Sequence, residues 1–103
     1  TLDNAEEDME ARLLAEAKVE ARRTLNAVRA ALAVDAGLLT AAERKQIEDL
    51  NDRVDKNLSS ADRAAILAAA EALEAGTKLF AERRMDRGIR AALAGRSVDQ
   101  FDL

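Results

Sequence analysis

The residues that usually carry acid–base or nucleophilic chemistry are scarce in this sequence. It contains no histidine and no cysteine, the commonest general base and the most reactive thiol nucleophile. Carboxylates are abundant, and the adjacent pairs Glu6–Glu7 and Glu48–Asp49 are the candidates for a general acid and base. Neighbouring residues on a helix point to different faces, however, whereas catalytic carboxylates must converge in a sheltered cleft. Because no glycine-rich phosphate-binding motif occurs either, we expect this chain to be no enzyme and to bind no metal or cofactor.

Arginines gather near the C-terminal end and are the second set of residues with recognisable chemistry. They could form a docking patch for an acidic partner or nucleic acid, or a solvated face whose cations offset the dipole of a helix C-terminus. Acidic residues interleave with them, no aromatic residue among them offers a base a stacking platform, and the net charge is −4. We therefore expect a solvated face and no nucleic-acid partner. The residues are Arg83, Arg84, Arg87, Arg90 and Arg96.

The composition is typical of an all-α protein with a small core. The 103 residues are 49% hydrophobic and 35% charged, with four glycines, no proline and only two phenylalanines as aromatic residues. No apolar run approaches the ~20 residues of a membrane helix, and neither a cysteine nor a signal peptide indicates export. We therefore expect a cytoplasmic protein without a membrane partner. Because the chain starts at Thr1 directly before a helix, we also expect a fragment of a longer protein.

One long helix, over about residues 3–36, organises the rest of the chain. Its apolar residues recur every three or four positions, no proline interrupts it, and no glycine precedes Gly37. Asp3 and Glu6 have the spacing of a capping box at its start, and Gly37 is the expected left-handed residue at its end. At ~1.5 Å per residue this helix is roughly 50 Å long, about twice the diameter of a compact domain of this size. The remaining residues therefore cannot cover it along its whole length.

Two further helices are predicted from apolar periodicity and capping signals. A capping box formed by Thr40 and Glu43 opens a second helix, and Ser59 or Ser60 caps a third. Gly88 interrupts the pattern that continues from the third helix, so this helix either runs on or gives way to a separate final helix. The predicted ranges are about 40–57 and 60–85, then 86–94 for the separate final helix and 95–103 for a polar tail.

Short connections between these helices favour antiparallel neighbours. The second helix is roughly 26 Å long and can run back along only the C-terminal half of the first. We therefore predict a single domain, an antiparallel three-helix bundle with a long projecting N-terminal helix. A short C-terminal helix is a possible fourth element. Its core should be one contiguous cluster. The predicted members are Leu25, Val28, Leu32, Ile47, Leu50, Val54, Ile66, Leu73 and Phe80.

The projecting half of the first helix carries the residues that we expect to form a domain-docking or self-association surface. Met9, Leu13, Leu14 and Val19 would lack cover within the bundle, and a wide apolar stripe seldom stays exposed in a working monomer. The alternative is that longer helices or a returning tail bury these residues in the same bundle. Because a symmetric contact uses the same patch twice, two copies of an isolated chain could also pair as a homodimer.

Several runs along the chain match a family pattern. They are DMEARLLAEAKVEAR over 8–22, LLTAAER over 38–44, FAERRMD over 80–86, RAAL over 90–93 and SVD over 97–99. These runs resemble HscA, the bacterial iron–sulfur-assembly branch of the DnaK-like heat-shock chaperones. The resemblance covers nearly the whole chain, and the RRMD run is fairly specific to that branch.

The resemblance implies that this chain is the non-catalytic C-terminal helical lid of an HscA-like chaperone. In that family an ATPase domain drives a β-sandwich that grips an extended peptide, and the lid closes over the peptide and slows its release. The lid's partner would be that sandwich, the client would be the iron–sulfur scaffold protein, and ATP would be a cofactor of the parent protein only. DnaK lids latch to the sandwich through an acid and a histidine, whereas a gapless alignment places Arg22 and Asn26 there. The alternative function is a free-standing helical adaptor that dimerises through its long helix.

Overall fold

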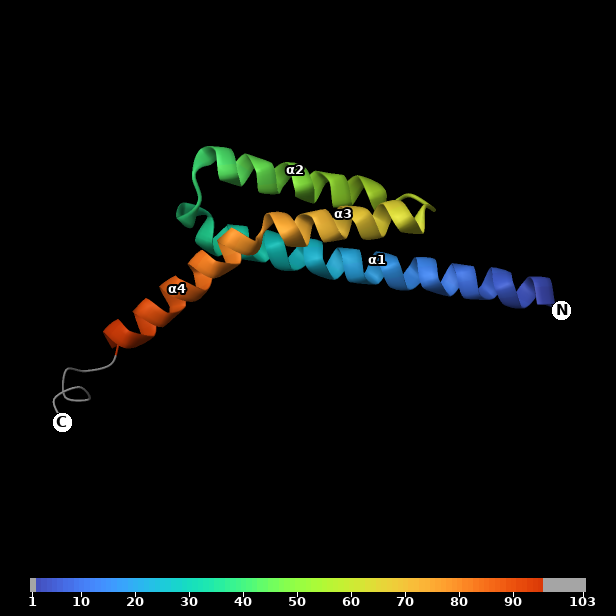
Figure 1. The fold of residues 1–103 in the computed structure, drawn as a ribbon, viewed down its shortest axis with the longest axis horizontal. Coiled ribbons are helices and arrows are strands. Elements are labelled where there is room, and N and C mark those ends of the chain that lie inside the picture. The colour runs from blue at the N-terminus through green and yellow to red at the C-terminus, as the bar shows by residue number, and fades with distance from the viewer. Residues whose placement is uncertain (1, 96–103) are drawn as a thin grey trace.

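The chain folds into four helices arranged around a short three-helix bundle (Figure 1). The computed structural model describes the backbone of residues 2–95 and the side chains of residues 5–95. The helices are α1 (Leu2–Asp35), α2 (Ala41–Asn57), α3 (Arg63–Gly76) and α4 (Lys78–Gly95), with the 3₁₀ turn η1 (Ala36–Leu38) between α1 and α2. The dimensions of 72 × 33 × 17 Å describe an elongated molecule. The predicted all-α bundle with a long N-terminal helix is confirmed.

The bundle is built on α1 from about Leu14 to the end of the helix. In Figure 1, α2 runs antiparallel to α1, and α3 returns between them in the direction of α1. The N-terminal end of α1 extends beyond the other two helices, and α4 leaves the bundle at an angle from the opposite end. Along the described part of the chain, no helix is both long and apolar enough to span a bilayer.

The predicted capping box at the start of α2 is confirmed. Thr40 has an extended backbone and is the N-cap residue. Its hydroxyl oxygen accepts the backbone N–H of Glu43 at 3.1 Å, and the Glu43 carboxylate accepts the backbone N–H of Thr40 at 2.9 Å. Two donors that the helix itself leaves without partners are therefore satisfied.

The two ends of α1 differ from expectation. Asp3 lies within the helix, which already begins at Leu2, so it is not the N-cap residue. Gly37 does not have a positive φ angle, because the chain continues into η1 and the N–H of Leu39 donates to the Ala36 carbonyl at 3.1 Å. A 3₁₀ turn satisfies terminal carbonyls with tighter bonds, so no left-handed residue is required.

The start of α3 also differs from expectation. Its N-cap residue is Asp62, whose carboxylate accepts the N–H of Ala65 at 3.1 Å, and not Ser59 or Ser60. The hydroxyl of Ser60 instead accepts the N–H of Asp62 at 2.9 Å and thereby shapes the turn that precedes the helix.

The predicted helix over 60–85 is broken at Thr77, well before the expected break near Asp86. Thr77 has φ −105° and ψ 4°, and its hydroxyl donates to the Leu73 carbonyl at 2.9 Å. Gly76, just before the break, lies so close to α2 that a Cβ atom there would overlap the Leu50 side chain. The chain turns at Thr77 into α4, which continues through Gly88 without interruption.

The predicted core is confirmed as one cluster, with two of its members at the edge. Leu25, Ile66, Leu73 and Val54 are the largest side chains with almost no exposed surface. Leu32 and Leu50 are only partly buried and pack against the cluster from outside. Alanines fill much of the remaining interior, because small side chains allow α1 and α3 to approach closely. The buried alanines are Ala17, Ala21, Ala31, Ala69 and Ala70.

Candidate docking surface

The four residues predicted to form one surface on α1 lie on different sides of the helix. Met9 and Val19 are 62% and 53% exposed, whereas Leu13 and Leu14 are half-buried. Leu14 packs against the core cluster, in line with Ala17 and Ala21. Successive residues on a helix are rotated by about 100°, so Val19 lies roughly 140° around α1 from Leu14. The expectation that Leu14 stands apart from the bundle core is therefore wrong.

Leu13 and Leu14 line a groove between α1 and the turn before α3. Ala61 and Arg63 form its other wall, and its volume is about 460 Å³. Glu7 and Glu10 border the groove on α1. This end of the bundle therefore combines a small apolar surface with carboxylates and is open to solvent.

The face of α1 that points away from the bundle is exposed around Val19. Arg22 and Asn26 follow Val19 by three and seven residues, and both are exposed. This spacing places all three on one side of the helix. We call Val19, Arg22 and Asn26 the outer face of α1. The positions where the family resemblance implies a latch thus lie on the same side of α1 as Val19, an exposed apolar residue near the middle of the helix.

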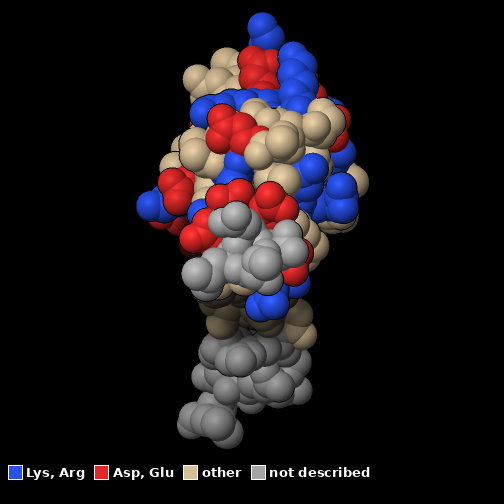
Figure 2. All heavy atoms as spheres, turned by 90° about the vertical axis from the view of Figure 1, so that its right-hand side faces the viewer, with Lys and Arg blue, Asp and Glu red and all other residues tan. Residues whose placement is uncertain are grey.

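The projecting end of α1 is strongly acidic. Glu6, Glu7, Asp8 and Glu10 are all exposed in its first turns. Figure 2, which looks at the molecule from this end, shows several acidic side chains near the start of α1, with acidic and basic side chains mixed over the rest of the view. Negative charge at this end stabilises the helix, because the helix dipole is positive at its N-terminus.

The arginines of α4 are not a simple solvated face, contrary to expectation. Arg84 donates from Nε to Asp35 Oδ2 at 2.8 Å, and Arg87 donates to the other oxygen of the same carboxylate. Asp35, the last residue of α1, is only 7% exposed. The Arg84 guanidinium also lies 5.8 Å from the centre of the Phe80 ring. Arg90 is exposed, and Arg96 lies outside the described residues.

Arg83 makes a third contact between α4 and the bundle. Its guanidinium binds both oxygens of Glu43, at 2.7 and 3.1 Å, and donates to the Leu38 carbonyl at 2.9 Å. The hydrogen bonds from Arg83, followed by the one from the Thr40 backbone, lower the pKa of Glu43 from 4.5 to about 2. We call Asp35, Glu43, Arg83, Arg84 and Arg87 the arginine clamp.

One local signal could have revealed part of this clamp. Asp35 places a negative charge at the C-terminal end of α1, where the helix dipole is also negative. An acid at that position is unfavourable unless a cation compensates it, so it indicates an arginine or lysine brought in from elsewhere. The described residues contain no cluster of side chains suited to a metal ion, and the clamp has no free carboxylate to offer one.

The chain is similar to curated chaperones over almost its full length. It is 53% identical over 95 residues, or 91% of the chain, to "Chaperone protein HscA homolog" of an Acidovorax species. It is 46% identical over 100 residues to "Chaperone protein HscA" of Klebsiella pneumoniae and 47% identical over 101 residues to that of Proteus mirabilis. The chain spans only 15–16% of the length of these relatives. No protein-family model matches it.

Proposed function

Because this chain is homologous to the HscA chaperones, we propose that it is the helical lid of such a chaperone. In this role it covers a peptide-binding β-sandwich and slows the release of the bound client. The chain corresponds to 15–16% of its relatives' length, which leaves ample room in the parent protein for the sandwich and for an ATPase domain. The iron–sulfur scaffold protein as client, ATP as the parent's cofactor and a cytoplasmic setting belong to the same proposal.

The observation that carries the proposal is the exposed outer face on a helix that extends past its own bundle. Val19 is 53% exposed, and the described part of the chain holds nothing that covers it. Full burial of an exposed valine side chain is worth roughly 1.5–3 kcal/mol, so covering the exposed half of Val19 with a second domain would favour the closed state by about half of that. Met9, on the acidic end of the same helix, is the second residue that such a domain could cover.

Arg22 and Asn26 suit a latch of different chemistry from that of the DnaK lids. A guanidinium carries five donors and no acceptor, and an amide carries both. The facing surface of the sandwich should therefore supply carboxylate or carbonyl oxygens. Arg22 is exposed and is held by no ion pair within the described residues, so it is available for such a contact.

The lid role is tested in the full-length chaperone. Val19→Glu places a charge in the proposed interface and should speed the dissociation of a fluorescein-labelled peptide from the iron–sulfur scaffold protein by about fourfold or more, the rate equivalent of the lost burial. Ile89→Glu is the matched control, because Ile89 is also 53% exposed but lies on α4. Release at the wild-type rate from the Val19→Glu protein would contradict the proposal.

Self-association through α1 is the second candidate function. It is favoured by the same exposure of Met9 and Val19, which two copies could cover mutually. Sedimentation velocity of the isolated chain at high micromolar concentration separates the two functions. A dimer that Met9→Glu with Val19→Glu dissociates supports the adaptor, whereas a monomer at all concentrations excludes it.

A further inference from the structure

The second half of α4 carries an apolar face that nothing in the described part of the chain covers. Met85, Ile89 and Leu93 are 67%, 53% and 47% exposed, and their spacing of four residues places them in one row along the helix. Within the described chain, Phe80 is the only buried residue of α4. In Figure 1, no other helix runs beside this part of α4. We call Met85, Ile89 and Leu93 the outer row of α4.

The orientation of α4 is the reverse of that expected for an amphipathic helix on a bundle. Such a helix normally turns its apolar side to the core and its charged side to solvent. Here Arg84 and Arg87 reach Asp35 at the end of α1. On a helix these two arginines lie roughly 140° and 160° around the axis from Ile89. The arginine clamp therefore fixes α4 so that its outer row points away from the bundle.

The exposed segment of α4 is too short to be a stable helix without a packing partner. From Met85 to Gly95 the helix has no buried residue, and Gly88 lies within it. Isolated helices shorter than about 12–15 residues are marginal in water, and a glycine within a helix lowers its stability further. A second element that covers the outer row would therefore stabilise this part of α4.

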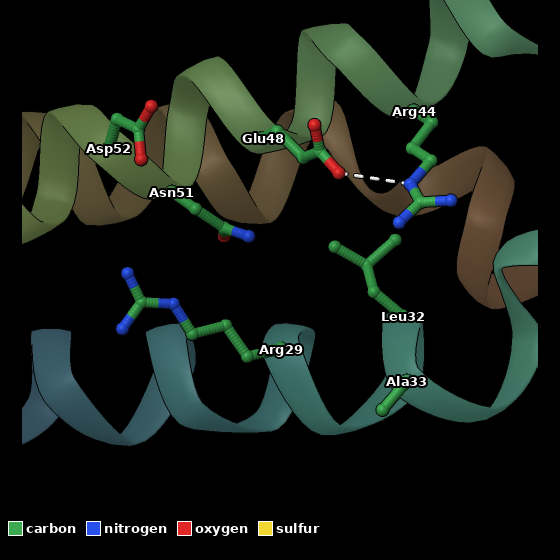
Figure 3. Close-up of a pocket in the computed structure, with 7 residues that line it drawn as sticks. All are labelled: Arg29, Leu32, Ala33, Arg44, Glu48, Asn51 and Asp52. Carbon is green, nitrogen blue, oxygen red and sulfur yellow. Dashed lines mark hydrogen bonds and ion pairs between the residues drawn. The ribbon is translucent and has the colours of Figure 1, made fainter.

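Two charged residues beside the outer row are also without partners in the described chain. Other exposed charges are paired, and Figure 3 shows one such pair beside the groove between α1 and α2, where Arg44 binds Glu48 at 2.9 Å. Asp86 and Arg90 form no ion pair with a described residue, although they are four residues apart on one helix. Both lie on the same flank of the outer row, roughly 60° and 100° around the axis from Ile89.

A second copy of α4 complements this face when it runs antiparallel to the first. With Ile89 placed against Ile89 of the second copy, Met85 lies opposite Leu93 and the outer row covers itself. A two-fold axis brings the same flank of both helices together. Asp86 then lies beside Arg90 of the second copy, offset by about 3 Å along the axis, and the symmetry gives two such ion pairs. The two bundles lie at opposite ends of the helix pair, because α4 leaves its bundle at an angle (Figure 1).

We propose that two copies of this chain associate through an antiparallel pair of α4 helices. Three partly exposed side chains from each copy bury less surface than the roughly 1,200–2,000 Å² of stable interfaces, so the dimer forms only at high micromolar concentration and above. The contact does not depend on the lid role and uses a different helix from a dimer formed through α1. At the dilution of a peptide-release measurement it is absent and does not affect the rate.

Sedimentation equilibrium of the full chain, from micromolar to millimolar concentration, tests the dimer. The wild-type chain should dimerise, and Ile89→Glu should weaken the association by about tenfold or more, because it places two charges at the centre of the contact. Leu79→Glu is the matched control, since Leu79 is 50% exposed on the same helix but lies ten residues before Ile89, outside the contact.

Two results of this measurement would overturn the proposal directly. One is a monomer at all concentrations, and the other is a dimer that Ile89→Glu leaves unchanged. A dimer that Met9→Glu with Val19→Glu dissociates would assign the association to α1 and would overturn it as well.

A pair of charge variants tests the antiparallel register. Asp86→Arg places like charges against Arg90 of the second copy, and Arg90→Asp places like charges against Asp86, so each variant alone should be monomeric. An equimolar mixture of the two should form a heterodimer, because each variant supplies the charges that the other lacks. Pairing within one helix cannot produce this recovery, since each variant carries two like charges on its own helix. A mixture that stays monomeric would exclude the proposed contact.

Discussion

Arg83 and Glu43 lie 40 residues apart in the sequence, yet the guanidinium of one binds both carboxylate oxygens of the other. This ion pair joins the second turn of α4 to the capping box of α2. Glu43 therefore has two roles, because its carboxylate accepts hydrogen bonds from both the Thr40 backbone N–H and the Arg83 guanidinium. The direction of α4 is set by this pair together with the contacts of Asp35.

The pH dependence of stability should report the Arg83–Glu43 pair. Because the pKa of Glu43 is lowered from 4.5 to about 2, its ionised form stabilises the fold above pH 4.5, and this stabilisation is lost as the pH falls towards 2. The melting temperature of wild type should exceed that of Glu43→Gln by a constant amount above about pH 5, and the two should converge between pH 4.5 and 2. Glutamine can still complete the capping box, so the comparison isolates the ion pair.

Glu48→Gln is the control for this measurement. It removes another carboxylate of α2 that is paired with an arginine, at 2.9 Å, but on an exposed surface and within a single helix. Such pairs contribute about 0.3–0.5 kcal/mol, so the melting temperature should barely change. A pH profile of Glu43→Gln parallel to that of wild type would show that the pair does not stabilise the fold.

Truncation of the central core residue should strongly destabilise the bundle. Leu73 has no exposed surface and contacts the core from α3, so Leu73→Ala should cost about 2–5 kcal/mol in the free energy of unfolding. Leu79→Ala, at a site 50% exposed, should cost less than about 0.5 kcal/mol. Urea denaturation followed by circular dichroism gives both values, and similar costs at the two sites would mean that the assigned core is wrong.

The close contact between Gly76 and Leu50 should appear as a coupling in a double-mutant cycle. Gly76→Ala alone should stabilise the chain by less than the helix propensity of alanine predicts, because the new methyl group forces the terminal methyl of Leu50 to move. In the Leu50→Ala background the same substitution should stabilise it by about 0.5–1 kcal/mol, since alanine is the better helix former. Equal effects of Gly76→Ala in both backgrounds would exclude the contact as the reason for glycine at this position.

Asn51→Leu should make the bundle more stable. The substitution removes a buried carbonyl without a partner and adds apolar surface of similar volume, for a gain of about 1 kcal/mol. Thermal unfolding of the two proteins at neutral pH measures the gain. Asn51→Ala should not reproduce it, because alanine leaves the space unfilled. A lower melting temperature for Asn51→Leu would indicate that the amide already has a partner within the bundle.

The parts of the fold that depend on residues close together in the sequence were predicted correctly. The apolar periodicity of α1 and the Thr40–Glu43 capping box follow from residues three or four positions apart, and the structure has both. The break at Thr77 was not predicted, because a hydroxyl–carbonyl bond such as that from Thr77 to Leu73 also occurs within continuous helices. The apolar pattern runs across Thr77 without any change that would indicate a turn.

The candidate sites were predicted less well, for two different reasons. The arginine clamp joins residues up to 52 positions apart, so only the acid at the end of α1 pointed to it. The prediction of a single apolar stripe on α1 was wrong for a reason that residue numbers alone could have shown. Leu14 and Val19 are five residues apart, and five residues turn a helix through about 500°, which leaves the two side chains on different sides.

The helix break at Thr77 separates the three-helix bundle from α4, and these two parts differ in stability. Phe80 is the one buried residue of the described α4, and the other contacts that join this helix to the bundle are the ion pairs of the arginine clamp and the hydrogen bond from Arg83 to the Leu38 carbonyl. Apolar contacts resist salt, whereas partly exposed ion pairs are screened by it. Amide hydrogens of α4 should therefore exchange with solvent through a local opening that added salt accelerates, while those of α3 exchange only when the whole bundle unfolds. The fourth helix would then behave as an arm that detaches and redocks many times within the lifetime of one folded bundle.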